Sequence, residues 1–304
     1  MRSLLLLALA LRLALPLWGD APVYSADTIF NAASNQPGAV APNTIAILTG
    51  ENLSQATAVF MLDNSGLLPI VLPGTGVEIV IGSLPVNPLY VSPTQITFLV
   101  PPNLPAGTFN LVLTIEGLDG PTIQIQLAET APALFQIDSQ NAMAVGADGL
   151  LITPDAPAMP GDSIVLYATG LGPTAPRVVY RQLPMQAATL SDIADFTVLL
   201  DGVAVDLSAI AYAGIAPGFA GMYEVDLTLP SATGANPQIQ IGFPDSLSPA
   251  GVTLPVQTTA PQPQSAKPRR ATPLPAKPVA AKQLPAQPVP AQPVPAQQPV
   301  PARP

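Results

Sequence analysis

The chain has 304 residues, of which 48% are apolar and 10% are charged, and it contains neither cysteine nor histidine. These absences exclude disulfides, thiol nucleophiles, Ser-His-Asp triads, imidazole acid–base chemistry and nearly all zinc and copper sites. Between Asp27 and Gln257 there are 18 acidic residues and two basic ones, Arg177 and Arg181, so this stretch should repel nucleic acid and anionic lipid headgroups.

Residues 1–21 are predicted to form a secretory signal peptide. Met1-Arg2-Ser3 is a short positive segment, and an unbroken apolar run follows from Leu4 to Leu11. Arg12 interrupts this run, which is shorter than the roughly 18 apolar residues of a membrane span. Small residues place the cleavage site between positions 19 and 26. No later apolar run is long enough to span a membrane, so the mature chain is expected to have no transmembrane segment.

The body of the chain is predicted to consist of short β-strands separated by turns. Polar and apolar residues alternate in Thr122–Leu127, which suits a strand with one buried face. Asp201-Gly202 lies between two apolar runs and predicts a two-residue hairpin turn. Pro and Gly interrupt the sequence too often for long helices. Other predicted strands are Ile45–Leu48, Val77–Ile81, Gln95–Val100, Phe109–Ile115 and Gln238–Ile241.

The body also contains an internal repeat. Ala41–Ile45 resembles Met159–Ile164, and the segment ending at Pro101 resembles the one ending at Pro230. Repeated units of this size, made of short strands, are typical of β-sandwiches. The sequence therefore predicts an all-β protein with two tandem immunoglobulin-like β-sandwiches, at 28–130 and 131–257, and a hinge near Thr130.

Four stretches resemble a family of uncharacterised exported proteins of Acidobacteria, particularly Solibacter-type species. The stretches are Asn31–Ser34 with Pro37-Gly38, Tyr90–Ile96, Pro160–Pro173 and Gly214–Tyr223. The resemblance covers about residues 29–257. It implies units like the IPT/TIG branch of immunoglobulin-like folds, and it implies no established activity and no site residues.

The segment 258–304 has a different composition from the body. Fourteen of its 47 residues are Pro, and it has six basic residues and no acidic one. Such a sequence favours an extended polyproline II or disordered tail. The tail is interpreted either as a spacer or as a basic segment that contacts an anionic envelope polymer or a proline-binding partner.

Two carboxylate pairs are candidates for hydrolysis without histidine. They are Asp192 with Asp195, and Glu224 with Asp226. Glu224 and Asp226 share one face of a predicted strand whose other face is apolar, so a solvent-facing surface is the simpler interpretation.

Two further kinds of site can be considered. Oxygen ligands make calcium the best metal candidate, and the possible loops are Asp63–Gly66, Asp138–Asn141 and Asp148-Gly149. None has the EF-hand spacing, and turn formation explains these residues more simply. Gly214–Tyr223 is either an aromatic ligand platform or a tight loop packed on the core. No catalytic, cofactor-binding or metal-binding residue is predicted, and no cofactor is expected.

The leading functional hypothesis is a non-catalytic, exported binding or adhesion module at the cell surface or in the envelope, with a glycan or an envelope protein as partner. The alternatives are a structural spacer and, more remotely, a carboxylate-based glycoside hydrolase. Localisation is predicted to be periplasmic, cell-surface or extracellular. The absence of His and Cys favours a protein that acts by presenting surfaces.

Overall fold

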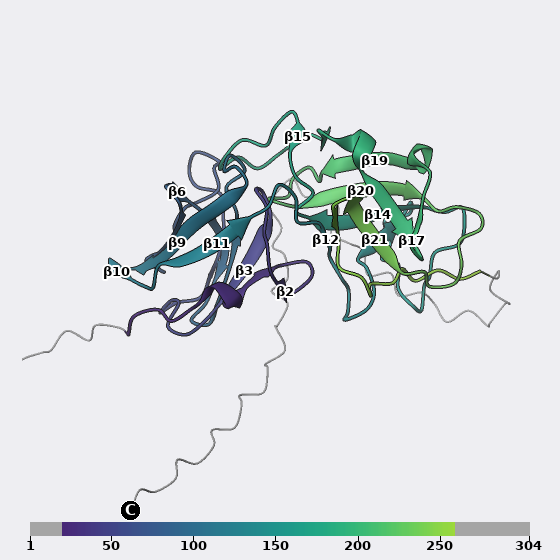
Figure 1. Ribbon diagram of the computed structural model, residues 1–304. Helices are drawn as coiled ribbons and strands as arrows, with labels where there is room; N and C mark the ends of the chain where they lie inside the picture. Colours follow the sequence, from purple (N-terminus) through teal and green to yellow (C-terminus); the bar gives the residue numbers. More distant parts are fainter. Residues whose placement is uncertain (1–19, 259–304) are drawn as a thin grey trace, which may run out of the picture.

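The computed structural model describes residues 20–258 and shows two tandem immunoglobulin-like β-sandwiches side by side (Figure 1). Most of the predicted signal peptide and nearly all of the predicted tail lie outside these residues. Within the described part, strands joined by turns make up the fold, as predicted, and the only helical elements are three 3-10 turns. These are η1 (Ala26–Thr28), η2 (Ile193–Asp195) and η3 (Leu207–Ala209). No helix in this part is long and apolar enough to cross a membrane.

The first sandwich consists of two antiparallel sheets. One has the strand order β2 (Gln36–Pro37), β1 (Ile29–Asn31), β3 (Ile45–Thr49), β8 (Gln95–Leu99), β7 (Asn87–Val91) and β4 (Ala58–Val59). The other has the order β10 (Leu118–Asp119), β9 (Gly107–Ile115), β5 (Val77–Ile81) and β6 (Leu84–Pro85), with β11 (Ile123–Leu127) also paired to β9.

The second sandwich has the same two-layer plan. Its larger sheet has the order β12 (Ala133–Leu134), β14 (Ser163–Thr169), β20 (Tyr223–Thr228), β19 (Ile210–Ile215), β16 (Ala188–Leu190) and β15 (Thr174–Ala175), with β13 (Ala144–Gly146) also paired to β14. Its smaller sheet has the order β18 (Val203–Ala204), β17 (Thr197–Leu200), β21 (Ile239–Phe243) and β22 (Ser246–Leu247).

Alternating side chains fill each core. In β5, Val77, Ile79 and Ile81 are buried while the residues between them are half-buried. One buried apolar cluster draws only on residues 24–127 and a second only on residues 134–256, and Thr130 lies between these ranges. Burial of one such Val, Leu or Ile side chain contributes about 1.5–3 kcal/mol. Each sandwich therefore has its own core.

The internal repeat is visible in the hydrogen bonds that start β3 and β14. The Ala41 N–H donates to Thr44 Oγ1 in the first sandwich, and the Met159 N–H donates to Asp162 Oδ2 in the second. Each of these side chains closes a tight turn in front of the strand that pairs with β8 or β20. The two sandwiches thus share a local turn as well as a strand pattern.

A third apolar cluster lies between the sandwiches. It includes Ile45, Leu68 and Leu99 from the first and Phe135 and Met222 from the second. Ile45 and Leu68 are fully buried. Because Ile45 faces this cluster while Ala46 and Leu48 face the first core, both faces of β3 are covered. This explains the continuous apolar run of β3, which differs from the alternation expected of a strand with one solvent face.

Candidate functional site

A cavity of about 410 Å³ lies at the junction of the two sandwiches, and we call it the junction cavity. Residues from both sandwiches line it, and its size falls within the roughly 300–1,000 Å³ typical of small-molecule sites. The lining of the first sandwich includes Pro42, Asn43, Pro102, Leu104, Pro105 and Ala106, and that of the second includes Gly172, Pro173, Thr174, Arg177, Asp192 and Tyr223. Glu129 and Thr130, from the connecting segment, complete the wall.

The buried part of the lining is a hydrogen-bonded group that spans both sandwiches. Asn43 Nδ2 donates to the Tyr223 hydroxyl at 3.1 Å, and that hydroxyl donates to the Gly172 carbonyl at 2.6 Å. Tyr223 is fully buried, and burial raises the pKa of its hydroxyl to about 12. Asn43 Oδ1 is buried and has no hydrogen-bond partner among the described residues. An unsatisfied buried acceptor costs on the order of 1–3 kcal/mol, so this oxygen stands out.

Sequence reasoning did not find Asn43, although the repeat holds a signal for it. Asn43 has φ +63°, and its counterpart in the second sandwich, Gly161, has φ +90°. A position with positive φ favours Gly and tolerates Asn. The first unit thus carries a polar side chain where the second carries none, and that side chain reaches the neighbouring sandwich.

Three charged side chains are exposed at the mouth of the junction cavity. They are Glu129, Arg177 and Asp192. Within residues 20–258, none of the three takes part in a hydrogen bond or ion pair through its side chain. The mouth therefore offers both donors and acceptors to an incoming molecule.

The relative position of the cavity walls is fixed beside the third apolar cluster. The Ile45 N–H donates to Thr169 Oγ1 at 3.1 Å, and that hydroxyl donates to the Gly221 carbonyl at 2.7 Å. A Cβ atom added to Gly221 would lie 2.7 Å from Ile45 Cγ1 and 2.4 Å from a Leu99 methyl carbon. The loop before β20 therefore lies so close to β3 and β8 that a side chain at position 221 would have to displace Ile45 or Leu99.

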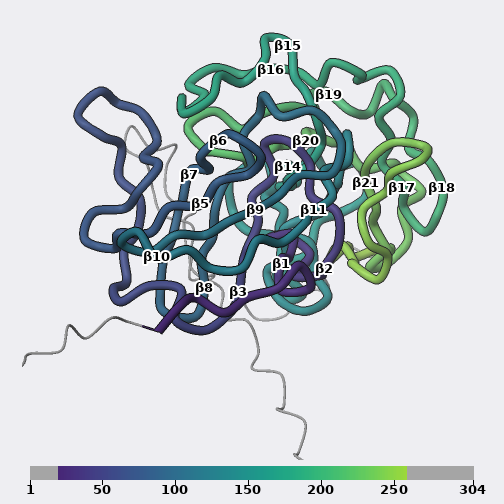
Figure 2. The backbone as a smooth tube through the Cα atoms, turned by 60° about the vertical axis from the view of Figure 1, so that its left-hand side comes forward, coloured from purple at the N-terminus to yellow at the C-terminus, as the bar shows by residue number. Residues whose placement is uncertain are grey.

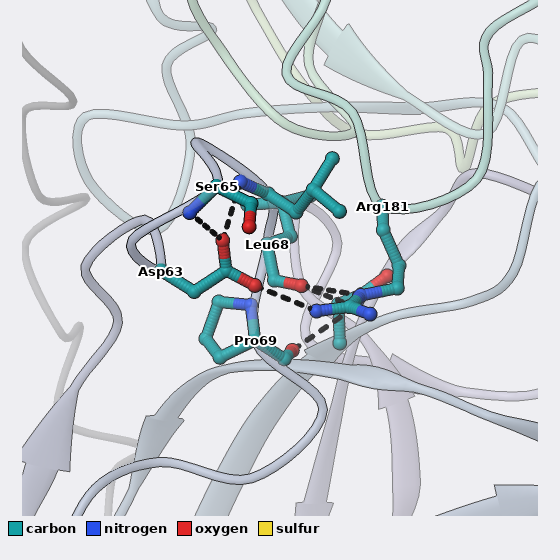
Figure 3. A network of polar contacts seen from close by, with 7 residues as sticks. Asp63, Ser65, Leu68, Pro69 and Arg181 are labelled. Carbon is teal, nitrogen blue, oxygen red and sulfur yellow. Dashed lines mark hydrogen bonds and ion pairs between the residues drawn. The ribbon is translucent and has the colours of Figure 1, made fainter.

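A second connection joins a loop of the first sandwich to the loop between β15 and β16. We call it the clasp, made of residues 63–69 and 180–182 (Figure 3). Arg181 Nη2 pairs with Asp63 Oδ2 at 2.9 Å, and Arg181 Nε donates to the Leu68 carbonyl at 2.9 Å. The Leu68 N–H in turn donates to the Arg181 carbonyl at 2.7 Å. The Tyr180 hydroxyl donates to the Pro85 carbonyl.

Asp63 forms part of a turn as well as an ion pair. Its Oδ1 accepts hydrogen bonds from the N–H groups of Leu67 and Ser65, at 3.0 and 2.8 Å (Figure 3). The pKa of Asp63 is held below its ordinary value. The main cause is the hydrogen bond from the Leu67 N–H, and the Ser65 N–H and the guanidinium of Arg181 contribute less. Of the two basic residues of the body, Arg181 thus belongs to the clasp and Arg177 to the cavity mouth.

The structure places the two carboxylate pairs found in the sequence in different surroundings. Asp192 lies at the mouth of the junction cavity, while Asp195 ends η2 and does not line the cavity. Glu224 and Asp226 are half-buried on one face of β20, and Tyr223, Val225 and Leu227 are buried on the other. The expected alternation along this strand is confirmed.

The calcium candidates act as turn residues in the structure. Asp138 Oδ1 accepts from the N–H groups of Gln140 and Asn141, and Asp148 Oδ1 accepts from the Leu150 N–H. The pKa of Asp138 is lowered mainly by the hydrogen bond from the Asn141 side-chain amide, and next by the one from the Gln140 N–H. Together with the Asp63 turn, these contacts account for all three loops by backbone capping.

The Gly214–Tyr223 stretch is a tight connection between β19 and β20. Tyr223 is fully buried, and Phe219 is half-buried against the apolar cluster between the sandwiches. The Gly218 N–H donates to the Pro184 carbonyl at 2.7 Å. The stretch therefore serves packing, and its aromatic rings do not form an exposed platform.

A further cavity of about 390 Å³ lies between the 146–152 and 156–164 segments of the second sandwich. The carboxylates in its lining are used locally, since Asp148 caps a turn and Asp162 Oδ2 accepts from the Met159 N–H. This cavity has walls from one sandwich only, and its charged groups are already engaged.

No protein-family model and no curated protein matches the chain. Among solved structures, SGBP-B from the mixed-linkage glucan utilization locus of Bacteroides ovatus is 14% identical with a TM-score of 0.30, covering 72% of this chain and 44% of that one. Domains 5–6 of the S-layer protein SbsC are 10% identical with a TM-score of 0.26, covering 79% and 100%. Titin domains Z1Z2 are 13% identical with a TM-score of 0.20, covering 79% and 98%.

The chain thus spans less than half the length of the Bacteroides ovatus protein. At these identities and TM-scores the likenesses concern the kind of fold alone.

Proposed function

We propose that this protein is an exported, non-catalytic binding module in which two immunoglobulin-like sandwiches act as one rigid body. The observation that carries the proposal is the junction cavity, whose walls come from both sandwiches and are held by a buried interface. Binding is stronger when a site is already formed, because no ordering cost remains to be met on association. A simple spacer needs no such composite cavity.

The hydroxyl groups of the cavity favour binding over covalent chemistry. The Tyr223 hydroxyl donates to the Gly172 carbonyl, and Thr174 Oγ1 donates to the Pro176 carbonyl at 2.8 Å. With no His or Cys in the chain, neither hydroxyl has the imidazole base that activates most serine and threonine nucleophiles. Their contacts hold the wall in shape.

Binding of the mature chain to immobilised envelope polysaccharides and envelope proteins of the source organism tests the proposal. We expect saturable binding to at least one fraction, measured by surface plasmon resonance. An unrelated tandem immunoglobulin-like protein of similar length serves as the matched control. Equal, non-saturable signals from both proteins across all fractions would refute a binding role and favour the spacer alternative.

A further inference from the structure

We infer that the junction cavity binds an uncharged, hydroxyl-rich ligand, namely a segment of a neutral saccharide chain. The inference rests on the proposed binding function and adds the location of the site and the chemical class of its ligand. It is argued from the shape of the cavity, its unpaired polar groups and the charge of the body around it.

The walls of the cavity combine apolar surface with fixed polar groups. Pro42, Pro102 and Pro173 present rigid rings of C–H groups, and the buried Leu104 also belongs to the lining. Sugar rings carry C–H faces between their hydroxyl groups. Apolar contact with rigid prolines buries those faces at little entropic cost, because a proline side chain has almost no rotamer freedom to lose.

The charged side chains of the lining are free to accept and donate. Arg177 supplies guanidinium donors, and Glu129 and Asp192 supply carboxylate acceptors. None of the three has a side-chain partner in the part of the chain that the structure describes. A hydroxyl group both donates and accepts, so it can pair with either kind of group at the mouth.

Asn43 gives an independent indication that the site is incomplete. Asn43 is a lining residue and only 3% exposed, and its Oδ1 is buried without a partner in the described part of the chain, while its Nδ2 donates to Tyr223. A ligand hydroxyl donated towards this oxygen would satisfy a buried acceptor that the folded chain leaves unpaired.

The charge of the molecule selects against anionic ligands. All 19 acidic residues of the chain lie in the described part, together with only two basic ones, Arg177 and Arg181. Since Arg181 is paired with Asp63, an approaching anion meets a single free guanidinium within a strongly negative body. A cation is attracted by that body, but an ammonium group only donates hydrogen bonds and so cannot pair with the guanidinium of Arg177 at the mouth. A neutral hydroxyl group can pair with the guanidinium and with the carboxylates.

The experiment titrates the purified mature chain with probes of each charge class by isothermal calorimetry. The neutral probes are cello-, xylo-, malto- and laminari-oligosaccharides. The charged probes are oligogalacturonate and chitosan oligomers, and triglycine represents a zwitterionic peptide. We expect at least one neutral probe to bind and the charged and zwitterionic probes to bind at least about tenfold more weakly, a difference of roughly 1.4 kcal/mol.

Two variants locate the binding. Ala106 is exposed at the cavity mouth, so Ala106→Trp should obstruct entry and weaken neutral-probe binding at least about tenfold without disturbing a core. Arg177→Ala should weaken it severalfold. Ala250, exposed and outside the cavity lining, gives the matched control Ala250→Trp, which should bind as wild type does. Thermal melting checks that all variants are folded.

Each outcome decides a separate point. Neutral-probe binding that survives Ala106→Trp would overturn the location and leave the binding function standing. Preferential, cavity-dependent binding of an ionic probe or of triglycine would overturn the ligand class. If no neutral probe binds wild type, the inference fails, and saturable binding to an envelope fraction would still support the proposed function.

Discussion

At the scale of single residues, the fully buried Tyr223 joins the two sandwiches through its hydroxyl. The contact depends on Asn43, a residue placed at a left-handed backbone position. That position was identifiable in the sequence, since the repeat aligns Ala41–Ile45 with Met159–Ile164. The partner of Asn43 was not, because Tyr223 is 180 residues away along the chain.

Tyr223→Phe tests this contact. The substitution keeps the ring and leaves the Gly172 carbonyl and Asn43 without their shared partner, so the free energy of unfolding should fall by about 1–3 kcal/mol. Chemical denaturation measures it. Tyr90→Phe is the matched control, because Tyr90 is half-buried and its hydroxyl makes no hydrogen bond in the described part, so its effect should be close to zero.

The same hydroxyl predicts a pH dependence. Its pKa is about 12 in the folded chain and about 10 when exposed, so the folded state holds its proton where the unfolded state loses it. This stabilisation is complete below about pH 10 and is lost as the pH rises towards 12, by up to about 1.4 kcal/mol per pH unit. Denaturation curves of wild type should show this slope, and those of Tyr223→Phe should lack this share of it.

At the scale of elements, local pattern predicted strands more accurately than it predicted their partners. Val77–Ile81 was predicted with the bounds of β5, and the Asp201-Gly202 turn joins β17 to β18 with φ +50° and +77°. Two-residue strands such as β4 and β6 were not predicted, because so few residues show no alternation. Their pairing depends on neighbours distant in sequence.

The junction cavity was beyond prediction for a related physical reason. Its lining comes from separate loops around residues 42, 104, 130, 174 and 192, which only the packing of the sandwiches brings together. The sequence of each loop on its own indicates turns and prolines and does not indicate which other loop it contacts. Besides the repeat at Asn43, the scarcity of basic residues was an available signal, since Arg177 and Arg181 are the only cations in an acidic body and both lie at the junction.

The clasp can be tested with Arg181→Gly. Arg181 has φ +65°, so glycine keeps the backbone conformation while the ion pair with Asp63 and the bond to the Leu68 carbonyl disappear. We expect faster amide hydrogen exchange in residues 63–69 and 178–184, with unchanged protection in β5 and β20. Mass spectrometry measures the exchange. Unchanged exchange in both loops would mean that the clasp contributes nothing to their order.

At the scale of the whole molecule, the third apolar cluster joins the two sandwiches. Figure 2 shows the molecule in a second view, with β15 and β16 at the top. Interfaces between domains of one chain are commonly small and mobile. Here both faces of β3 are covered, and Gly221 allows the close approach.

Substitution of Gly221 tests this coupling. Gly221→Ala and Gly202→Ala both place alanine at positive φ, +68° and +77°, but only the first adds a Cβ against Leu99 and Ile45, since nothing lies within 4 Å of a Cβ at Gly202. Overpacking typically costs about 1–3 kcal/mol. Gly221→Ala should therefore lower the free energy of unfolding, measured by chemical denaturation, by that much more than Gly202→Ala does.

Nuclear magnetic relaxation provides the second measurement. In wild type and Gly202→Ala, amides of β5 and β21 should report one common rotational correlation time. In Gly221→Ala the two values should separate as the interface loosens. Separate values already in wild type would contradict a rigid two-sandwich body.

The position of the two arginines has a practical consequence for proteolysis. Within residues 20–258, trypsin has only two bonds to cut, after Arg177 and after Arg181, and both belong to the loop that crosses between the sandwiches. The rate of tryptic cleavage therefore reports how often that loop unfolds locally and detaches from the first sandwich. The digest should pause at fragments ending at 177 or 181 that stay associated through the pairing of β14 with β20.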